Sequence, residues 1–214
     1  MIIFGHRGAP GYPRQGENTI ASFEKALNNG ATGLEFDVRR AGDGQIVVIH
    51  DDTIDRTTGS PGRVAELSSG QLGKFDIPLL ADVLDQFGDK CLLNIELKDV
   101  GIAAEVKRLV QERRIENNVI VSAFEWNELQ SLTPAIPIAL LASKLHRLLP
   151  AAQALGAAAI HPRKDIVNPL LIAAAHEAKI RVHVWTVNEP AEISLFRDLG
   201  VDGIFTDFPE RARG

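Results

Sequence analysis

Short apolar segments, each about the length of one β-strand, recur along the whole chain and alternate with helical patterns. The strand candidates are IIFG, GLEFDV, IVVIH, CLLNIEL, VIVSAF, IPIALL, AAIHP, RVHVWTV and DGIFTD. Segments such as NTIASFEKALNNG, which places Ile20, Phe23 and Leu27 on one face and ends at Gly30, separate most of them. This alternation predicts a mostly parallel sheet covered by helices. At 214 residues, it favours an α/β fold of the closed (β/α)8 TIM-barrel type over an open sheet.

One connection breaks the alternation, because only RAGDGQ joins the second strand candidate to the third. That segment is too short for a crossover helix, and Asp43-Gly44 is a strong turn signal. A tight hairpin would set Glu35 nearly opposite His50. A longer return that restores parallel order is the alternative, and the sequence leaves both open.

A polar, Gly- and Ser-rich segment from Asp52 to about Lys74 follows the third strand. We expect a short insertion there, a loop with one helical turn around Ser68 to Leu72. Loops of this length in compact domains are usually functional or disordered.

Composition indicates one globular domain over residues 1–214, with 45% hydrophobic residues and neither a repeat nor a linker. The formal net charge of −5 argues against a nucleic-acid partner. No apolar stretch approaches the ~18 residues of a membrane span, and the N-terminus does not resemble a signal peptide. Cys91 is the only cysteine, so no intramolecular disulfide can form. We therefore expect a cytoplasmic protein without an integral membrane segment; the oligomeric state is left open.

Ionisable residues gather where the predicted strands end, which is where barrel enzymes place their active sites. The pattern covers His6 and Arg7 after the first strand, Glu35 and Asp37 in the second, His50 after the third, Glu96 and Lys98 in the fourth, and His183 and Trp185 in the eighth. Each has a simpler interpretation, such as an exposed turn, an ion pair or a core side chain. Four consecutive strands ending in this way are better explained by one functional site.

Glu35 and Asp37 lie on one face of a strand, about 6.6 Å apart, where their charges repel and each is unfavourable to bury. Together with Glu96 they offer hard oxygen ligands for one divalent cation, Mg²⁺ or Ca²⁺. A cation would offset both the repulsion and the desolvation. The chain shows no zinc pattern, which would need more His or Cys.

The remaining charged residues suit an anionic phosphoryl group. Arg7 and Lys98 can stabilise its negative charge, as can a bound metal. His6 and His50 can transfer protons to and from the attacking and leaving oxygens. The residues thus indicate metal-assisted phosphoryl chemistry.

The ordered set of motifs resembles bacterial glycerophosphodiester phosphodiesterases, a (β/α)8-barrel family related to phosphoinositide-specific phospholipases C. The similarity extends nearly end to end: HRG at 6–8, ENT at 17–19, EFDV at 35–38, VVIHDDTIDRTT at 47–58, IPLLADVL at 77–84, NIELK at 94–98, VSAF at 121–124, VWTVN at 184–188 and GVDGIFTDFP at 200–209. Any single tripeptide is weak evidence, whereas the set at these spacings is highly specific.

The resemblance implies roles for the residues that match the family's motifs. It assigns metal binding to Glu35, Asp37 and Glu96, acid/base catalysis to His6 and His50, substrate binding to Arg7 and Lys98, and a wall of the glycerol pocket to Trp185. The implied reaction is metal-dependent cleavage of small-molecule glycerophosphodiesters, deacylated phospholipids such as glycerophosphocholine, into an alcohol and sn-glycerol 3-phosphate. The order in which the two histidines act is left open.

The chain departs from the family at Gly16, where proline commonly precedes ENT, and in its shorter insertion, which predicts a less covered cleft. Two alternatives follow. A lysophospholipase D-like enzyme would need an apolar ramp at the mouth, for which Ile77, Leu80 and Leu84 are the candidates. A non-catalytic phosphodiester-binding barrel should lack at least one of the catalytic residues.

Overall fold

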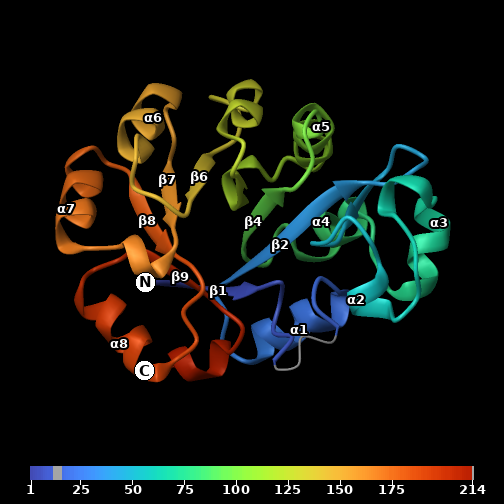
Figure 1. Ribbon diagram of the computed structural model, residues 1–214, viewed down its shortest axis with the longest axis horizontal. Coiled ribbons are helices and arrows are strands. Elements are labelled where there is room, and N and C mark those ends of the chain that lie inside the picture. Colours follow the sequence, from blue (N-terminus) through green and yellow to red (C-terminus); the bar gives the residue numbers. More distant parts are fainter. Residues whose placement is uncertain (12–15, 214) are drawn as a thin grey trace.

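The computed structural model describes residues 1–11 and 16–213, which form a closed barrel of parallel strands surrounded by helices (Figure 1). The barrel strands are β1 (Ile2–His6), β2 (Gly33–Arg40), β4 (Leu92–Leu97), β5 (Val119–Ala123), β6 (Ile138–Ala142), β7 (Ala159–Pro162), β8 (Arg181–Val184) and β9 (Gly203–Thr206). Each pairs with its neighbour in the order β1-β9-β8-β7-β6-β5-β4-β2, and β1 also pairs with β2. This closure confirms the predicted (β/α)8 fold.

Helices connect the strands on the outside of the barrel. They are α1 (Ile20–Asn28), α4 (Leu80–Phe87), α5 (Ala103–Arg113), α6 (Leu148–Leu155), α7 (Pro169–Glu177) and α8 (Pro190–Asp198), with 3₁₀ turns η3 (Glu116–Asn118), η4 (Trp126–Ser131), η5 (Lys164–Ile166) and η6 (Pro209–Ala212). Helix α1 begins at a Thr19 capping box. Gly30, which the sequence indicates as the end of the helix, lies directly after the C-cap residue Asn29 with φ 96°. None of the helices in the described ranges is long and apolar enough to cross a membrane.

The core lies between the barrel and the helices, and it fixes which side chains point inward. Leu34, Phe36 and Val38 of β2 are fully buried. Phe36 packs against Phe23 of α1 with ring centroids 5.4 Å apart. Since successive strand residues face opposite sides, the residues between them, Glu35 and Asp37, point into the barrel.

Strand β3 (Ile46–Val48) lies outside the barrel and pairs antiparallel with β2, Val38 opposite Val48. The connection after β2 is therefore the tight hairpin, not the longer return. If this register is continued to His50, the residue opposite His50 is Phe36. The sequence suggests Glu35, which is one residue away. His50 is nevertheless brought to the inward-facing carboxylates.

The insertion after β3 is a small lobe at one side of the barrel, beside α1 and α4 (Figure 1). It contains α2 (Asp55–Thr58), η1 (Val64–Glu66), α3 (Ser69–Leu72) and η2 (Gly73–Phe75). A separate cluster of buried side chains holds it together: Ala41, Val47, Ile49, Ile54, Val64, Leu72 and Ile77. Helix α3 is the helical turn that the sequence predicts, capped by Ser68; helix α2 is an addition.

Candidate active site

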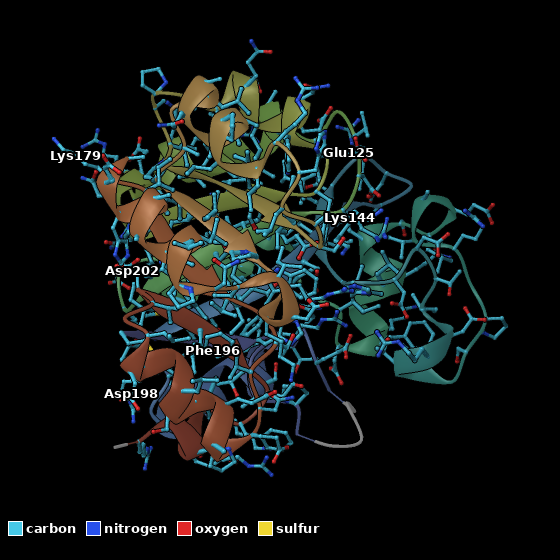
Figure 2. The ribbon with its side chains drawn as sticks, turned by 60° about the vertical axis from the view of Figure 1, so that its left-hand side comes forward. Glu125, Lys144, Lys179, Phe196, Asp198 and Asp202 are labelled. Atoms are coloured by element: carbon cyan, nitrogen blue, oxygen red, sulfur yellow. The ribbon has the colours of Figure 1, made fainter. Side chains whose placement is uncertain are left out.

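A cavity of about 170 Å³ opens at the carboxyl ends of the barrel strands. In Figure 2, Glu125 and Lys144, which follow β5 and β6, lie toward the insertion, whereas Lys179 and Asp202, which precede β8 and β9, lie at the opposite edge. The cavity is lined by His6, Arg7, Glu35, His50, Asn94, Glu96, Lys98, Phe124, Leu141, Trp185, Thr186 and Phe205. It thus brings together all but one of the residues singled out from sequence as catalytic, binding or metal-ligating.

The exception, Asp37, lies just beneath the cavity and completes an acidic cluster with Glu35 and Glu96. One ligand atom from each of the three carboxylates lies within 4.8 Å of the others. Burial, followed by repulsion from Asp37, raises the pKa of Glu35 well above its usual value and that of Glu96 to about 7. The cluster is therefore short of positive charge.

Two cationic side chains supply part of that charge. The backbone N–H of Arg7 donates to Glu35 Oε2 at 2.8 Å, and its Nε lies 3.4 Å from Asp37 Oδ2. Lys98 Nζ donates to Glu96 Oε1 at 2.7 Å and lies 3.7 Å from Asp37 Oδ1. Burial would raise the pKa of Asp37, but Arg7, His50 and Lys98 together hold it below its usual value. Asp37 therefore stays ionised at the centre of the cluster.

The cluster fits a divalent cation by the chemistry of its donors. All three candidate ligands are carboxylates, which suit a hard ion. Asp37 Oδ1 is buried, yet it accepts no hydrogen bond from any residue within the described ranges. A buried oxygen of this kind normally has a partner. An ion between the three carboxylates would provide it.

Asn18 fixes the orientation of Asp37 from the loop before α1. Its Nδ2 donates to Asp37 Oδ2 at 3.0 Å, and its Oδ1 accepts the Asp37 backbone N–H at 3.3 Å. Asn18 is 3% exposed and adopts a positive φ of 57°, a region that asparagine tolerates better than most residues. The ENT motif contains this residue, but no feature of the motif connects it with Asp37.

His6 is the last residue of β1 and is oriented by Asp207, which directly follows β9. His6 Nδ1 lies 2.8 Å from Asp207 Oδ1, and the Asp207 carboxylate also accepts from Asn188 Nδ2 at 2.8 Å. Since a carboxylate only accepts, His6 Nδ1 carries the proton and Nε2 faces the acidic cluster, 3.9 Å from Glu35 Oε2. The sequence interpretation missed Asp207, although the motif GVDGIFTDFP contains it.

His50 has an equivalent partner in the adjacent residue, Asp51. The distance from His50 Nδ1 to Asp51 Oδ1 is 2.6 Å. Burial lowers the pKa of His50, and Asp37 opposes that shift. Arg56 of α2 donates from Nε to Asp51 Oδ2 at 2.6 Å. Both imidazoles of the site are therefore held through Nδ1 by an aspartate.

Aromatic side chains line the cavity together with the charged groups. Trp185, predicted as a pocket wall, lines the cavity and donates from Nε1 to the carbonyl oxygen of His161 at 2.7 Å. Phe124 packs edge-on against it with ring centroids 5.7 Å apart and is 44% exposed. The cavity lining thus combines apolar rings with charged groups.

His183, noted on the same face as Trp185, lies deeper in the barrel. It is fully buried, with its Nδ1 3.1 Å from His161 Nε2. Burial lowers the pKa of His183 to about 3 and that of His161 well below its usual value. Both rings are therefore neutral, and neither lines the cavity.

Comparison with known proteins identifies the family of this chain. Residues 6–211 match the model of the glycerophosphoryl diester phosphodiesterase family. The chain is 36% identical to a glycerophosphodiester phosphodiesterase of Bacillus altitudinis, over 98% of this chain and 96% of that protein. It is 33% identical to another from Caldanaerobacter subterraneus subsp. tengcongensis, over 98% and 95%.

Solved structures show the same barrel. The crystal structure of a glycerophosphodiester phosphodiesterase from Agrobacterium tumefaciens superposes with a TM-score of 0.86 and 27% identity, covering 99% of this chain and 98% of that one. A second, from Thermotoga maritima, gives a TM-score of 0.84 and 26% identity, covering 98% and 96%. The fold, the family match and these relatives agree: this chain belongs to the glycerophosphoryl diester phosphodiesterase family.

Proposed function

We propose that this enzyme hydrolyses glycerophosphodiesters, deacylated phospholipids such as glycerophosphocholine, to an alcohol and sn-glycerol 3-phosphate, and that it requires a divalent cation. One observation carries the proposal: two imidazoles, each held through Nδ1 by an aspartate, border one cavity with an acidic cluster and two cations. Such a cavity suits a phosphodiester, which needs charge stabilisation and two proton transfers.

Glu35, Asp37 and Glu96 would hold the cation, Mg²⁺ or Ca²⁺. When bound, it would supply positive charge to the phosphoryl oxygens and lower the pKa of a nearby hydroxyl group. Arg7 and Lys98 would bind the remaining phosphate charge; Arg7 can do so in a bidentate manner. Trp185, with Phe124, would pack against the carbon atoms of the glycerol.

The two histidines would carry the protons. We assign the first step to His6, because its Nε2 lies beside Glu35 and the acidic cluster. His6 would remove the proton from the glycerol 2-hydroxyl, whose oxygen attacks phosphorus, while His50 protonates the departing alcohol. The cyclic phosphate formed would then be opened by water, with His50 now accepting a proton and His6 returning one to the 2-oxygen.

The two alternatives receive less support. Ile77, Leu80 and Leu84, the candidate ramp for an acyl chain, are all at most 7% exposed and belong to the core. The non-catalytic alternative predicts a missing residue, yet every predicted acid/base and ligand residue reaches the cavity or the cluster beneath it.

Two broader expectations join this proposal. Residues 1–214 would act as a single domain, because the site combines His6 from the first strand with Asp207 after the last. A cytoplasmic location would suit a chain whose only cysteine, Cys91, cannot form an internal disulfide. Limited proteolysis and cell fractionation would test these points.

The direct test is a hydrolysis panel with purified protein. We expect glycerol 3-phosphate from glycerophosphocholine and glycerophosphoethanolamine, loss of activity in chelator, and recovery with Mg²⁺ or Ca²⁺. Lysophosphatidylcholine serves as the acylated comparison and should react more slowly. Release of glycerol 3-phosphate from none of the diesters, with metal present, would contradict the proposal.

A further inference from the structure

Arg56 lies outside the cavity, in the four-residue helix α2 of the insertion, and none of the roles above includes it. Its guanidinium binds two carboxylates at once. Nε and Nη2 donate to the two oxygens of Asp51 at 2.6 and 3.1 Å, and Nη1 and Nη2 donate to the two oxygens of Glu17 at 3.0 and 2.6 Å. Both carboxylates are thus bound in bidentate geometry, which fixes angle as well as distance.

Each of these carboxylates contacts an active-site residue through the same oxygen that meets Nη2. Asp51 Oδ1 holds His50 Nδ1 at 2.6 Å. Glu17 Oε1 accepts from Arg7 Nη1 at 2.9 Å. A continuous chain of contacts therefore runs from the proposed proton donor His50, through Arg56, to the proposed phosphate ligand Arg7.

Negative and positive groups alternate along this series of contacts. The positive charge of Arg56 therefore stabilises the two carboxylates on either side of it. The Glu17 side chain is only 1% exposed and carries its charge between two guanidinium groups. Without Arg56, Glu17 and Asp51 would face each other as unshielded like charges. Glu17 would keep Arg7, whereas Asp51 would keep only His50 and solvent.

We propose that Arg56 is a positioning residue, which sets the orientation of His50 relative to Arg7 by bridging Asp51 and Glu17. The inference rests on the proposed function of His50 and Arg7. It also gives the insertion a specific role, because the Arg56 guanidinium of this lobe would orient His50 and Asp51. Lysine cannot replace it, because an ammonium group lacks the planar fork that spans two carboxylates.

The test compares Arg56→Ala and Arg56→Lys with the control Arg63→Ala. Arg63 lies in the same insertion, is 59% exposed at its side chain and pairs with Asp52, which is not part of the chain of contacts. We expect kcat to fall roughly 10–100-fold in both Arg56 variants, as for other residues that orient a site group. Arg63→Ala should match the wild type.

Two further readouts separate positioning from a general structural role. Added guanidinium should restore much of the kcat of Arg56→Ala and leave Arg63→Ala unchanged. The double variant Arg56→Ala/Asp51→Asn should lose little more than the larger single loss, because both changes break one connection. Independent, fully additive losses, or an Arg56→Ala variant with the kcat of Arg63→Ala, would overturn the inference.

A measurement without turnover keeps the two proposals distinguishable. The ¹⁵N chemical shift of His50 Nδ1 reports its protonation and its bond to Asp51, and it should change in both Arg56 variants but not in Arg63→Ala. If the wild type released no glycerol 3-phosphate, the proposed function would fail while this shift still tested Arg56. An unchanged shift in folded Arg56→Lys would contradict the positioning role.

Discussion

The two histidines of the cavity have the same partner chemistry but different supports. His6 ends β1 and Asp207 directly follows the neighbouring strand β9, and their side chains are 12% and 4% exposed. His50 and Asp51 follow the edge strand β3, are 31% and 26% exposed, and are tied to the rest of the site through Arg56. Strand pairing of β1 with β9 and the Asn188 contact therefore support the first pair, whereas the ion pairs of Arg56 support the second.

This difference suggests that the two histidines are held with different rigidity. Sheet hydrogen bonds are numerous and shielded from water, so the geometry of the His6 pair follows from the barrel itself. Partly exposed ion pairs are weaker and are screened by salt. We expect substitutions at the His6–Asp207 pair to reduce activity more than equivalent substitutions at the His50–Asp51 pair.

The largest effects should come from removing either imidazole. His6→Ala and His50→Ala should each lower kcat by about 10²–10⁴-fold, because each proton transfer loses its catalyst. Steady-state kinetics at saturating metal would measure this. His176→Ala is the matched control, since His176 also pairs with an aspartate, Asp202, but at the far end of the barrel. Wild-type turnover in either site variant would refute its acid/base role.

The partner aspartates should differ, which sharpens the comparison. Asp207→Asn removes a buried carboxylate that solvent cannot replace, and we expect kcat to fall by roughly 100-fold. Asp51→Asn removes a more exposed one, whose place solvent can partly take, and the loss should be nearer about 10-fold. Parallel kinetics on the two variants decide the point. Equal losses would mean that burial does not separate the two halves.

The acidic cluster should make the barrel side less stable when no metal is bound. Glu96 has a pKa raised to about 7, so its charged form is disfavoured in the folded protein. Glu96→Gln should therefore raise the free energy of unfolding by roughly 1–3 kcal/mol in chelator, and it should reduce the stabilisation produced by added metal. Thermal unfolding with and without Mg²⁺ would test both. A destabilised metal-free variant would show that the bond to Lys98 outweighs the relief of repulsion.

The smallest effect concerns the buried pair of His161 and His183 beneath the cavity. The folded pKa of His183, about 3, lies below the usual value of 6.5, so the unfolded chain binds the proton first. The stability that this ring contributes is complete above pH 6.5 and is lost as the pH falls toward 3. The slope is at most about 1.4 kcal/mol per pH unit for each ring. Denaturant unfolding between about pH 7 and 5 should be less pH-dependent in His183→Leu than in the wild type.

Most of the fold could be predicted from sequence, because a closed barrel repeats one local pattern. In strands such as GLEFDV, the alternation of apolar and polar residues shows which face is buried, and charged residues lie at the ends of the strands. The orientation of β3 was harder, since RAGDGQ is compatible with more than one path. Helix α2 was missed because its four residues, DRTT, are too few to show a helical period.

The sequence pointed to candidate ligands and histidines that the fold brings together, but it did not identify the residues that orient them. Asp207 lies 201 residues from His6, and only closure of the barrel brings the two together. Asn18 and Glu17 were visible in ENT, yet their partners, Asp37 and Arg56, are decided by how a loop and the insertion pack. The spacing of residues in the sequence indicates local geometry. Contacts between residues far apart in the sequence depend on the three-dimensional fold.

The pairing of β1 with both β2 and β9 has a consequence for how activity arises during synthesis. Translation makes His6 201 residues before Asp207, so over that whole stretch the nascent chain contains His6 without the partner that orients it. If His6 acts as proposed, full activity is expected only after the last strand has left the exit tunnel. We therefore expect a prematurely terminated product lacking β9 to be much less active than the full chain, even though it contains Glu35, Asp37 and Glu96.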